Sequence, residues 1–195
     1  MLYSFCPQSG CTDGDSPTAA LVQATDGNFY GATVVGGANQ ACNDGFGCGT
    51  VFQMTPSGTL TTLHSFDNTD GAFPEAALIQ DTSGTLYGTT AEGASKIGKY
   101  QQCSGICGTV FSLSVGLGPF VEAQPGSGKV GAAINILGTD LTGATSVTFN
   151  GTAAKFIVVS SSEITTTVPS GATTGEVEVV TPSGTLSSNV SFQVP

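Results

Sequence analysis

Acidic residues gather in the loops that precede the apolar segments of the first half of the chain. Asp13, Asp15, Asp67, Asp70 and Glu75 all lie in such loops. Paired carboxylates can hydrolyse glycosides, one acting as an acid and the other as a base or nucleophile. Asp-Gly and Asp-Asn steps are also ordinary turn chemistry, in which the side chain accepts hydrogen bonds from nearby backbone amides. We favour the turn interpretation and keep Asp13 and Asp70 as candidates for ligand contact.

A cofactor is not expected from these residues. The segment at 67–71, DNTDG, has some of the oxygen ligands of a calcium loop. It lacks the ligand spacing and the closing glutamate of an EF-hand. We therefore predict no cofactor and no metal, and calcium is the alternative.

Nucleophilic catalysis lacks its motifs. A serine hydrolase needs a nucleophile elbow and a base, and the chain has no G-x-S-x-G and only one histidine, His64. The position that matches His64 near the N-terminus is Tyr3, and a position that accepts either ring favours a packing role. No Gly-Lys-Ser/Thr phosphate loop occurs either. We expect no catalytic residues.

Four aromatic residues are worth weighing as ligand platforms. Tyr30 and Tyr87 occupy equivalent positions before a glycine, and packing between strands is the preferred account of both. Phe46 and Tyr100 lie instead in long glycine-rich loops, where an aromatic ring has less structural purpose. We predict that Phe46 and Tyr100, with Asp13 and Asp70, contact a ligand.

The cysteines form three close pairs, each beside a segment expected to be a strand: Cys6 with Cys11, Cys42 with Cys48, and Cys103 with Cys107. A zinc site would need four ligands, yet no Cys-x2-Cys occurs. We predict three local disulfides, and these favour an oxidising, extracellular or cell-surface location.

One stretch that the chain contains twice must position these residues. AALVQATDGNFYGAT at 19–33 matches AALIQDTSGTLYGTT at 76–90, and each copy places a tight turn between two apolar runs, which is typical of a β-hairpin. A second hairpin follows, because CGTVFQM at 48–54 matches CGTVFSL at 107–113 and a turn leads from the first of these into TLTTLHSF. Repeats of this length indicate a propeller or solenoid array.

Two segments depart from this pattern of four strands per repeat. Residues 2–5, LYSF, match the last strand LHSF at 63–66, so we predict a strand there. The expected fourth strand of the second repeat is replaced by SVGLGPFVEAQPGSG at 114–128. Because Met1 is followed at once by the strand-like segment, we interpret the chain as part of a longer secreted protein.

The repeats resemble the GloVer repeats of large secreted bacterial proteins. The resemblance rests on L-I-Q-D-x-x-G-x-L-Y-G-T-T, met at 78–90, and on G-T-V-F-x-L-x-P-S-G-T-L-x-x-L-x-S-F, met at 49–66. It covers residues 2–113 and implies β-propeller blades. It carries no defined biochemical role.

Residues 119–195 contain no cysteine and show six or seven short alternating segments, as expected for a two-sheet sandwich. They resemble an IPT/TIG domain, an immunoglobulin-like fold, through P-x-S-G-K-V-G at 125–131, V-T-F-N-G at 147–151 and V-P-S-G-A-x-x-G at 168–175. The resemblance implies a spacer or binding role.

The predicted fold is therefore all-β. It has two four-stranded propeller-like blades at 1–118 (about 2–66 and 67–118), and an immunoglobulin-like β-sandwich at 119–195.

The net charge of the chain limits the classes of partner that it can bind. The net charge is −10, and all four cationic side chains are lysines. Nucleic acids and anionic membrane surfaces both require clustered cations, so neither is expected. No apolar run approaches the roughly 20 residues of a membrane helix.

We therefore expect a secreted, non-enzymatic module for cell-surface attachment, carbohydrate binding or structural spacing. The alternative is an extracellular glycosidase that uses paired loop carboxylates. A carbohydrate or a cell-surface polymer is the expected partner. Two blades are fewer than the roughly four to eight that close a propeller, so we also predict a homo-oligomer, favouring a trimer in which residues 2–5 complete a neighbour's second blade.

Overall fold

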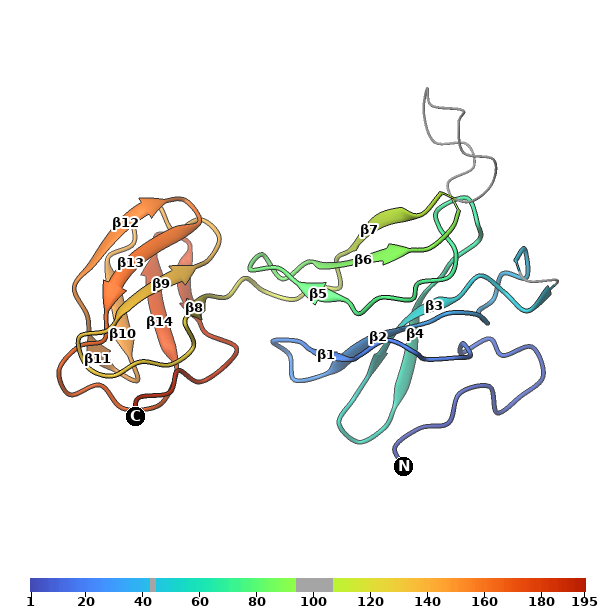
Figure 1. Cartoon of the computed structure of the whole chain (residues 1–195), viewed down its shortest axis with the longest axis horizontal. Coiled ribbons are helices and arrows are strands. Elements are labelled where there is room, and N and C mark those ends of the chain that lie inside the picture. Colours follow the sequence, from blue (N-terminus) through green and yellow to red (C-terminus); the bar gives the residue numbers. More distant parts are fainter. Residues whose placement is uncertain (43–44, 94–106) are drawn as a thin grey trace, which may run out of the picture. The chain divides into compact units, whose positions relative to one another are not determined.

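The structure is a computed structural model, and it describes residues 1–42, 45–93 and 107–195. The chain divides into two compact units, residues 1–81 with 85–115 and residues 82–84 with 116–195 (Figure 1). Every named element of both units is a β-strand, so the all-β prediction is confirmed. Within the described ranges no helix has the length and apolar character needed to cross a membrane.

The first repeat forms one antiparallel sheet, with strand order β1-β2-β3-β4. Its strands are β1 (Val22–Gln23), β2 (Phe29–Thr33), β3 (Thr50–Met54) and β4 (Leu60–Ser65). Gly27 lies in the turn between β1 and β2 with a φ of 79°, a conformation that glycine adopts without steric cost. The two predicted hairpins of this repeat are confirmed.

The second repeat forms an antiparallel sheet of three described strands: β5 (Ile79–Gln80), β6 (Leu86–Thr90) and β7 (Thr109–Leu113). Its register copies that of the first sheet, because Gly31 pairs with Phe52 in one and Gly88 with Phe111 in the other. A side chain at either glycine would collide with the partner's ring. No fourth strand follows β7 in this sheet, because residues 114–128 do not continue the sequence pattern of the repeat.

The prediction of a strand at residues 2–5 is wrong. This segment has no strand geometry, although it packs as the sequence match suggests. The ring of Phe5 lies 5.0 Å from the ring of Phe52 in a T-shaped contact, as Phe66, just after β4, lies 5.1 Å from Phe111. The reason is that β4 pairs with β3, whereas the described chain offers residues 2–5 no neighbouring strand to complete a ladder.

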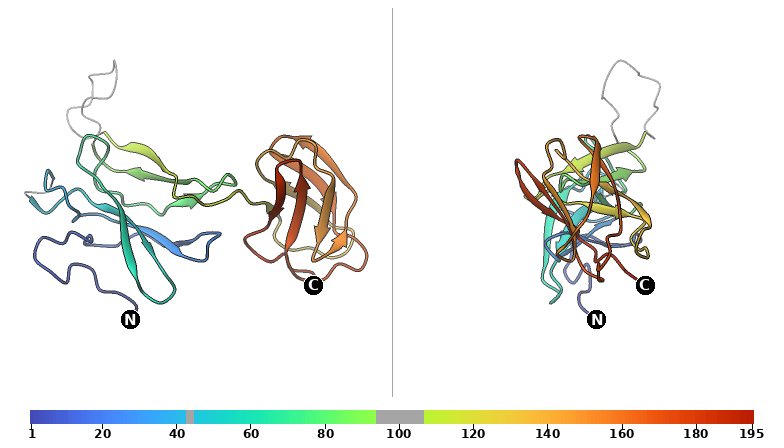
Figure 2. Two further views of the ribbon diagram at one scale, coloured as in Figure 1. Left: turned by 180° about the vertical axis from the view of Figure 1, so that it is seen from behind. Right: turned by 90° about the vertical axis from the view of Figure 1, so that its left-hand side faces the viewer.

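The two sheets of the first unit pack on each other through this aromatic contact. Polar contacts join them at the first hairpins, since the amide N–H of Thr25 donates to Gln80 (3.2 Å) and Gln80 donates back to the Thr25 hydroxyl (3.1 Å). Figures 1 and 2 show the sheet of β5–β7 beside the sheet of β1–β4.

The second unit is a two-sheet sandwich. One sheet has the order β11-β10-β14-β15 and the other β12-β13-β9-β8. The strands are β8 (Glu122–Gln124), β9 (Ala133–Leu137), β10 (Ser146–Phe149), β11 (Thr152–Ala153), β12 (Phe156–Ser160), β13 (Glu163–Thr167), β14 (Val177–Thr181) and β15 (Gly184–Ser187). These eight strands exceed the six or seven segments expected from the sequence, and β8 and β11 are the shortest of them.

Alternating residues of these strands form the core of the sandwich. Val147, Phe149, Ile164, Val177 and Val179 are all buried between the two sheets. Each comes from a face that the sequence alternation predicted, because successive strand side chains point to opposite sides. The immunoglobulin-like sandwich is therefore confirmed.

Candidate functional site

A ring-to-carboxylate contact occurs once in each repeat. His64 Nε2 lies 2.7 Å from Asp70 Oδ2, and the hydroxyl of Tyr3 donates to Asp13 Oδ2 over 2.8 Å. His64 matches Tyr3 in the repeat, and Asp70 matches Asp13. The side chains of His64 and Asp70 are 40% and 42% exposed, so their attraction is largely screened by solvent.

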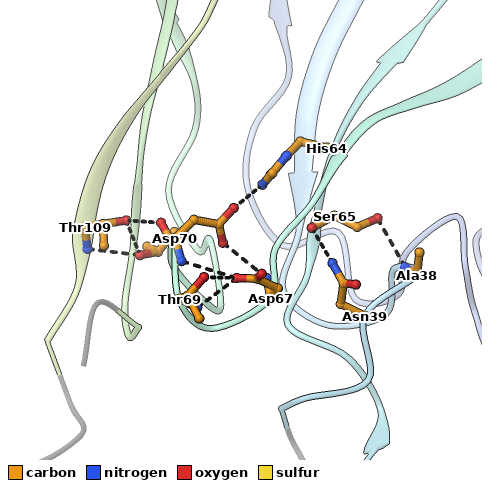
Figure 3. Close-up of polar contacts among 9 residues, drawn as sticks. Ala38, Asn39, His64, Ser65, Asp67, Thr69, Asp70 and Thr109 are labelled. Atoms are coloured by element: carbon orange, nitrogen blue, oxygen red, sulfur yellow. Dashed lines mark hydrogen bonds and ion pairs between the residues drawn. The ribbon is translucent and has the colours of Figure 1, made fainter. Parts of the chain in front are cut away.

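Each of these aspartates also holds a turn. Asp70 Oδ1 accepts the backbone N–H of Asp67 (3.1 Å), as Asp13 Oδ2 accepts that of Cys6 (3.1 Å). Asp67 in turn accepts the hydroxyl and the backbone N–H of Thr69, at 2.6 and 2.9 Å (Figure 3). These hydrogen bonds, with the Thr69 hydroxyl foremost, lower the pKa of Asp67 below its ordinary value.

A threonine pair lies beneath the Asp70 turn. The hydroxyls of Thr90 and Thr109 are 2.8 Å apart, and the backbone oxygen of Asp70 accepts from Thr109 at 3.2 Å. The first repeat has the same pair, with the hydroxyls of Thr33 and Thr50 also 2.8 Å apart. The loop is thus fixed to the strand ends of its own repeat.

A cavity of about 210 Å³ opens beside His64 and Asp70. We call it the seam cavity, because its walls come from both sheets of the first unit. Its lining residues are Val51, His64, Phe66, Asp70, Phe111, Ser112 and Leu113. The floor is apolar and the rim carries an imidazole, a carboxylate and a hydroxyl, a combination typical of small-ligand sites.

The first repeat has a matching cavity of about 320 Å³, which we call the N-terminal cavity. Its lining includes Tyr3, Phe5, Phe52 and Met54, the counterparts of His64, Phe66, Phe111 and Leu113. Asp13 is not among the residues that line it. The seam cavity therefore differs from its counterpart in having an exposed acid and a histidine at the rim.

The structure places the predicted ligand residues apart. Asp70 lines the seam cavity, whereas Asp13 contacts Tyr3 and the backbone of Cys6. Phe46 is 66% exposed and lines neither cavity. Tyr100 lies outside the described residues, so its role stays a prediction.

Tyr30 belongs to a separate polar network and is no exposed platform, since the residue is only 1% exposed. Its hydroxyl donates to Asp26 over 2.9 Å and accepts from Gln53 over 2.8 Å. Burial, followed by the hydrogen bond to Asp26, raises the pKa of Tyr30 to about 12. Burial acts to raise the pKa of Asp26 as well, but hydrogen bonds from Asn28, Tyr30 and Gln53 outweigh it and lower that pKa.

Two of the predicted disulfides are present, Cys6–Cys11 and Cys42–Cys48. The third includes Cys103, which lies outside the described residues. In the described part of the chain, the sulfurs of Cys6 and Cys11 come close to the carboxylate of Asp15, as three metal ligands would. Both sulfurs are bonded to each other, so this group is a disulfide beside an acid.

Sequence reasoning missed the seam cavity. It assigned His64 to packing and left Phe66, Phe111 and Ser112 without a role. The signal was available in the repeat itself, because aligning Tyr3 and Asp13 with His64 and Asp70 shows that both members of the pair recur together. The cavity walls come from strands distant in sequence, so only their packing reveals them.

Comparison with known proteins gives two family matches. Residues 1–154 match the family model described as the Gloeobacter/Verrucomicrobia repeat, and residues 120–194 match the IPT/TIG domain. Both agree with the resemblances drawn from the motifs. No curated protein sequence matches the chain.

Among solved structures, the chain aligns with a fungal alcohol oxidase described as having catalytic diversity among the AA5 family, in complex with copper. The identity is 13%, and the TM-score is 0.28. The alignment covers 92% of this chain and 41% of that one. This chain thus spans less than half of the oxidase, and so low a score carries no argument about fold or chemistry.

Proposed function

The chain belongs to the Gloeobacter/Verrucomicrobia repeat family and carries an IPT/TIG domain, and from this we propose a non-enzymatic module that binds carbohydrate or a cell-surface polymer outside the cell. Repeat and IPT/TIG domains indicate a binding or structural module. The finer assignment to carbohydrate rests on the seam cavity.

The observation that carries the non-enzymatic part is the repeated ring-to-carboxylate contact. A tyrosine and a histidine differ in acidity, yet the Tyr3 hydroxyl and the His64 Nε2 atom lie 2.8 and 2.7 Å from an aspartate that holds the same turn. A catalytic acid or base depends on its particular pKa, whereas a structural contact needs only a hydrogen-bonding ring. The shared role of Asp13 and Asp70 is therefore to fix their loops.

The shape of the seam cavity supports a small polar ligand. Its volume of about 210 Å³ is below the roughly 300 Å³ at which drug-sized pockets begin, so one sugar unit at the end or edge of a polymer suits it. The rings of Phe66 and Phe111 offer an apolar floor to the C–H face of a sugar. His64, Asp70 and Ser112 offer donors and acceptors to its hydroxyls.

An extracellular setting is supported by the disulfides. Two of them lie in the first unit, at Cys6–Cys11 and Cys42–Cys48. Disulfides persist where the environment is oxidising. The low content of positively charged side chains suits an uncharged polymer better than an anionic one.

A glycan array tests the binding proposal. We expect the labelled chain to bind a subset of neutral glycans, and Asp70→Asn to weaken that binding about tenfold, as the loss of one hydrogen bond to a charged group would. The matched control is Asp13→Asn, which removes the same charge from the equivalent turn without touching the seam cavity.

Two results would argue against this proposal. Equal losses in both variants would mean that turn stability, rather than the seam cavity, governs binding. Turnover of chromogenic glycosides or esters that a single Asp or Glu substitution abolishes would favour a hydrolase using loop carboxylates.

A further inference from the structure

Equivalent residues of the two repeats differ sharply in exposure. Val51 and Leu78 are 1% and 3% exposed, whereas their counterparts Val110 and Leu21 are 78% and 46% exposed. Val51 and Val110 lie in the third strand of their sheets, and Leu21 and Leu78 each come just before the first strand. The difference must therefore come from what lies against each sheet.

Val51 and Leu78 are buried where the first sheet packs on the second. Val51 lines the seam cavity from β3, and one methyl of Leu78 lies close to Gly88, beside the Phe111 ring that lines the same cavity from β7. Val110 alternates along β7 with Phe111, so it faces away from this contact. Leu21 lies beside Phe52 on the outer side of the first sheet, where the N-terminal cavity opens.

We propose that these two exposed faces bind each other between copies of the chain, head to tail, in the arrangement that the two repeats already use within one chain. The Val110 face of one protomer would take the place of the Val51 face. The Leu21 face of its partner would take the place of the Leu78 face. A second copy is the fitting occupant because this chain itself carries both halves of the contact, and the internal contact joins the equivalent faces of the two repeats.

The edge of β7 supports the same occupant. In the described chain β7 pairs only with β6, whereas its counterpart β3 also pairs with β4. In that pairing Thr50 lies opposite Ser65 and Val51 opposite His64. Residues 2–5 match 63–66 in sequence, so the partner's segment adds to β7 with Ser4 opposite Thr109 and Tyr3 opposite Val110.

The partner's segment is already placed for this role. Phe5 packs on Phe52 of its own first sheet as Phe66 packs on Phe111. Strand addition to the neighbour's β7 therefore leaves that packing unchanged. It also supplies the ladder partner whose absence leaves residues 2–5 without strand geometry, and covers an edge that would otherwise be open to association.

A head-to-tail contact has a property that a symmetric one lacks: each copy uses two different faces. Val110→Lys destroys one face and Leu21→Lys the other, so each variant alone is expected to be monomeric, with a mass of 19.4 kDa by light scattering. An equimolar mixture of the two variants retains one intact pair of faces. It should form a dimer of twice that mass and nothing larger, while the unaltered chain forms larger assemblies.

The control is Ile157→Lys, which places the same charge on a strand residue of the sandwich that is 69% exposed. It should leave the mass of the unaltered assembly intact. Circular dichroism confirms that each variant is folded before its mass is interpreted. A monomeric unaltered chain at all concentrations, or a mixture of variants that stays monomeric, would overturn the proposal.

A photo-crosslinking residue at position 110 tests the register. The cross-links should map to residues 1–5 or to Leu21 of the partner, which line the same cavity. Cross-links that fall only on the sandwich unit would contradict strand addition.

Discussion

At the scale of single residues, Tyr30 shows how a buried hydroxyl is tied to the sheet it belongs to. Its hydrogen bonds to Asp26 and from Gln53 satisfy the hydroxyl inside the first sheet. The second repeat has Ser83 where the first has Asp26, and Ser112 where it has Gln53. The tyrosine position is therefore shared between repeats while its acidic partner is not.

The pKa of Tyr30 gives a pH prediction. A folded-state pKa of about 12 lies above the ordinary value of 10.0, so unfolding releases the proton more readily between these two values. The stability from this group is fully present below pH 10 and is lost as the pH rises toward 12. Ultraviolet titration of the phenolates should show a tyrosine that ionises at about pH 12 and is absent from Tyr30→Phe. A titration in which all tyrosines ionise together near 10 would contradict the buried hydrogen bond.

Gly71 provides a second test at this scale. Its φ is +144°, and a side chain there would lie 2.7 Å from a methyl of Thr90 and 2.8 Å from the Thr109 hydroxyl. Gly71→Ala should lower the free energy of unfolding by about 2–3 kcal/mol, through backbone strain together with this collision. Gly27→Ala is the control, because Gly27 also has a positive φ but open space around it. If chemical denaturation shows that both variants lose the same free energy of unfolding, the side chains of Thr90 and Thr109 move aside at little cost.

At the scale of elements, the internal repeat allowed the hairpins to be predicted. The Asp26-Gly27 turn and the shared CGTVF segments were sufficient, because turn residues and alternation are local signals. The same reasoning failed for residues 2–5. A match to LHSF describes a segment that can be a strand, but strand geometry also needs a hydrogen-bonding neighbour, which sequence similarity does not supply.

The disulfides make a prediction about elements. Each closes a short loop, so chain entropy alone gives about 2 kcal/mol for a bond such as Cys42–Cys48. Replacing both of these cysteines by alanine should lower the free energy of unfolding by at least that much, because Cys42 and Cys48 are also buried.

Non-reducing peptide mapping should find three local pairs, Cys103 with Cys107 among them. Free thiols, or a bond between the two repeats, would contradict this.

At the scale of the whole molecule, the sequence predicted the repeated antiparallel hairpins and the immunoglobulin-like sandwich. It did not predict the seam cavity between the two repeat sheets. The alternating segments of residues 119–195 indicated a two-sheet sandwich, and Val147, Phe149 and Val177 are buried in its core. The seam cavity has walls from β3, β4, β7 and the loop at Asp70. Its geometry depends on how two sheets pack, and no local pattern encodes that.

Two separate cores predict two unfolding events. Phe66 is buried in the first unit and Phe149 in the sandwich, each 1% exposed. Truncation of either to alanine should cost about 3–5 kcal/mol, because it removes a large buried ring. In scanning calorimetry Phe66→Ala should lower only one transition and Phe149→Ala only the other. A single transition that both variants lower equally would show that the units unfold together.

We propose that this chain binds a glycan and leaves it unchanged. The most direct measurement takes a glycan retained on the array, incubates it with a stoichiometric amount of the chain, and follows the glycan by mass spectrometry. We expect a saturable complex, weakened by Asp70→Asn but not by Asp13→Asn, in which the glycan keeps its original mass. Cleavage products that form with the unaltered chain and disappear when Asp67 or Asp70 is replaced would contradict it.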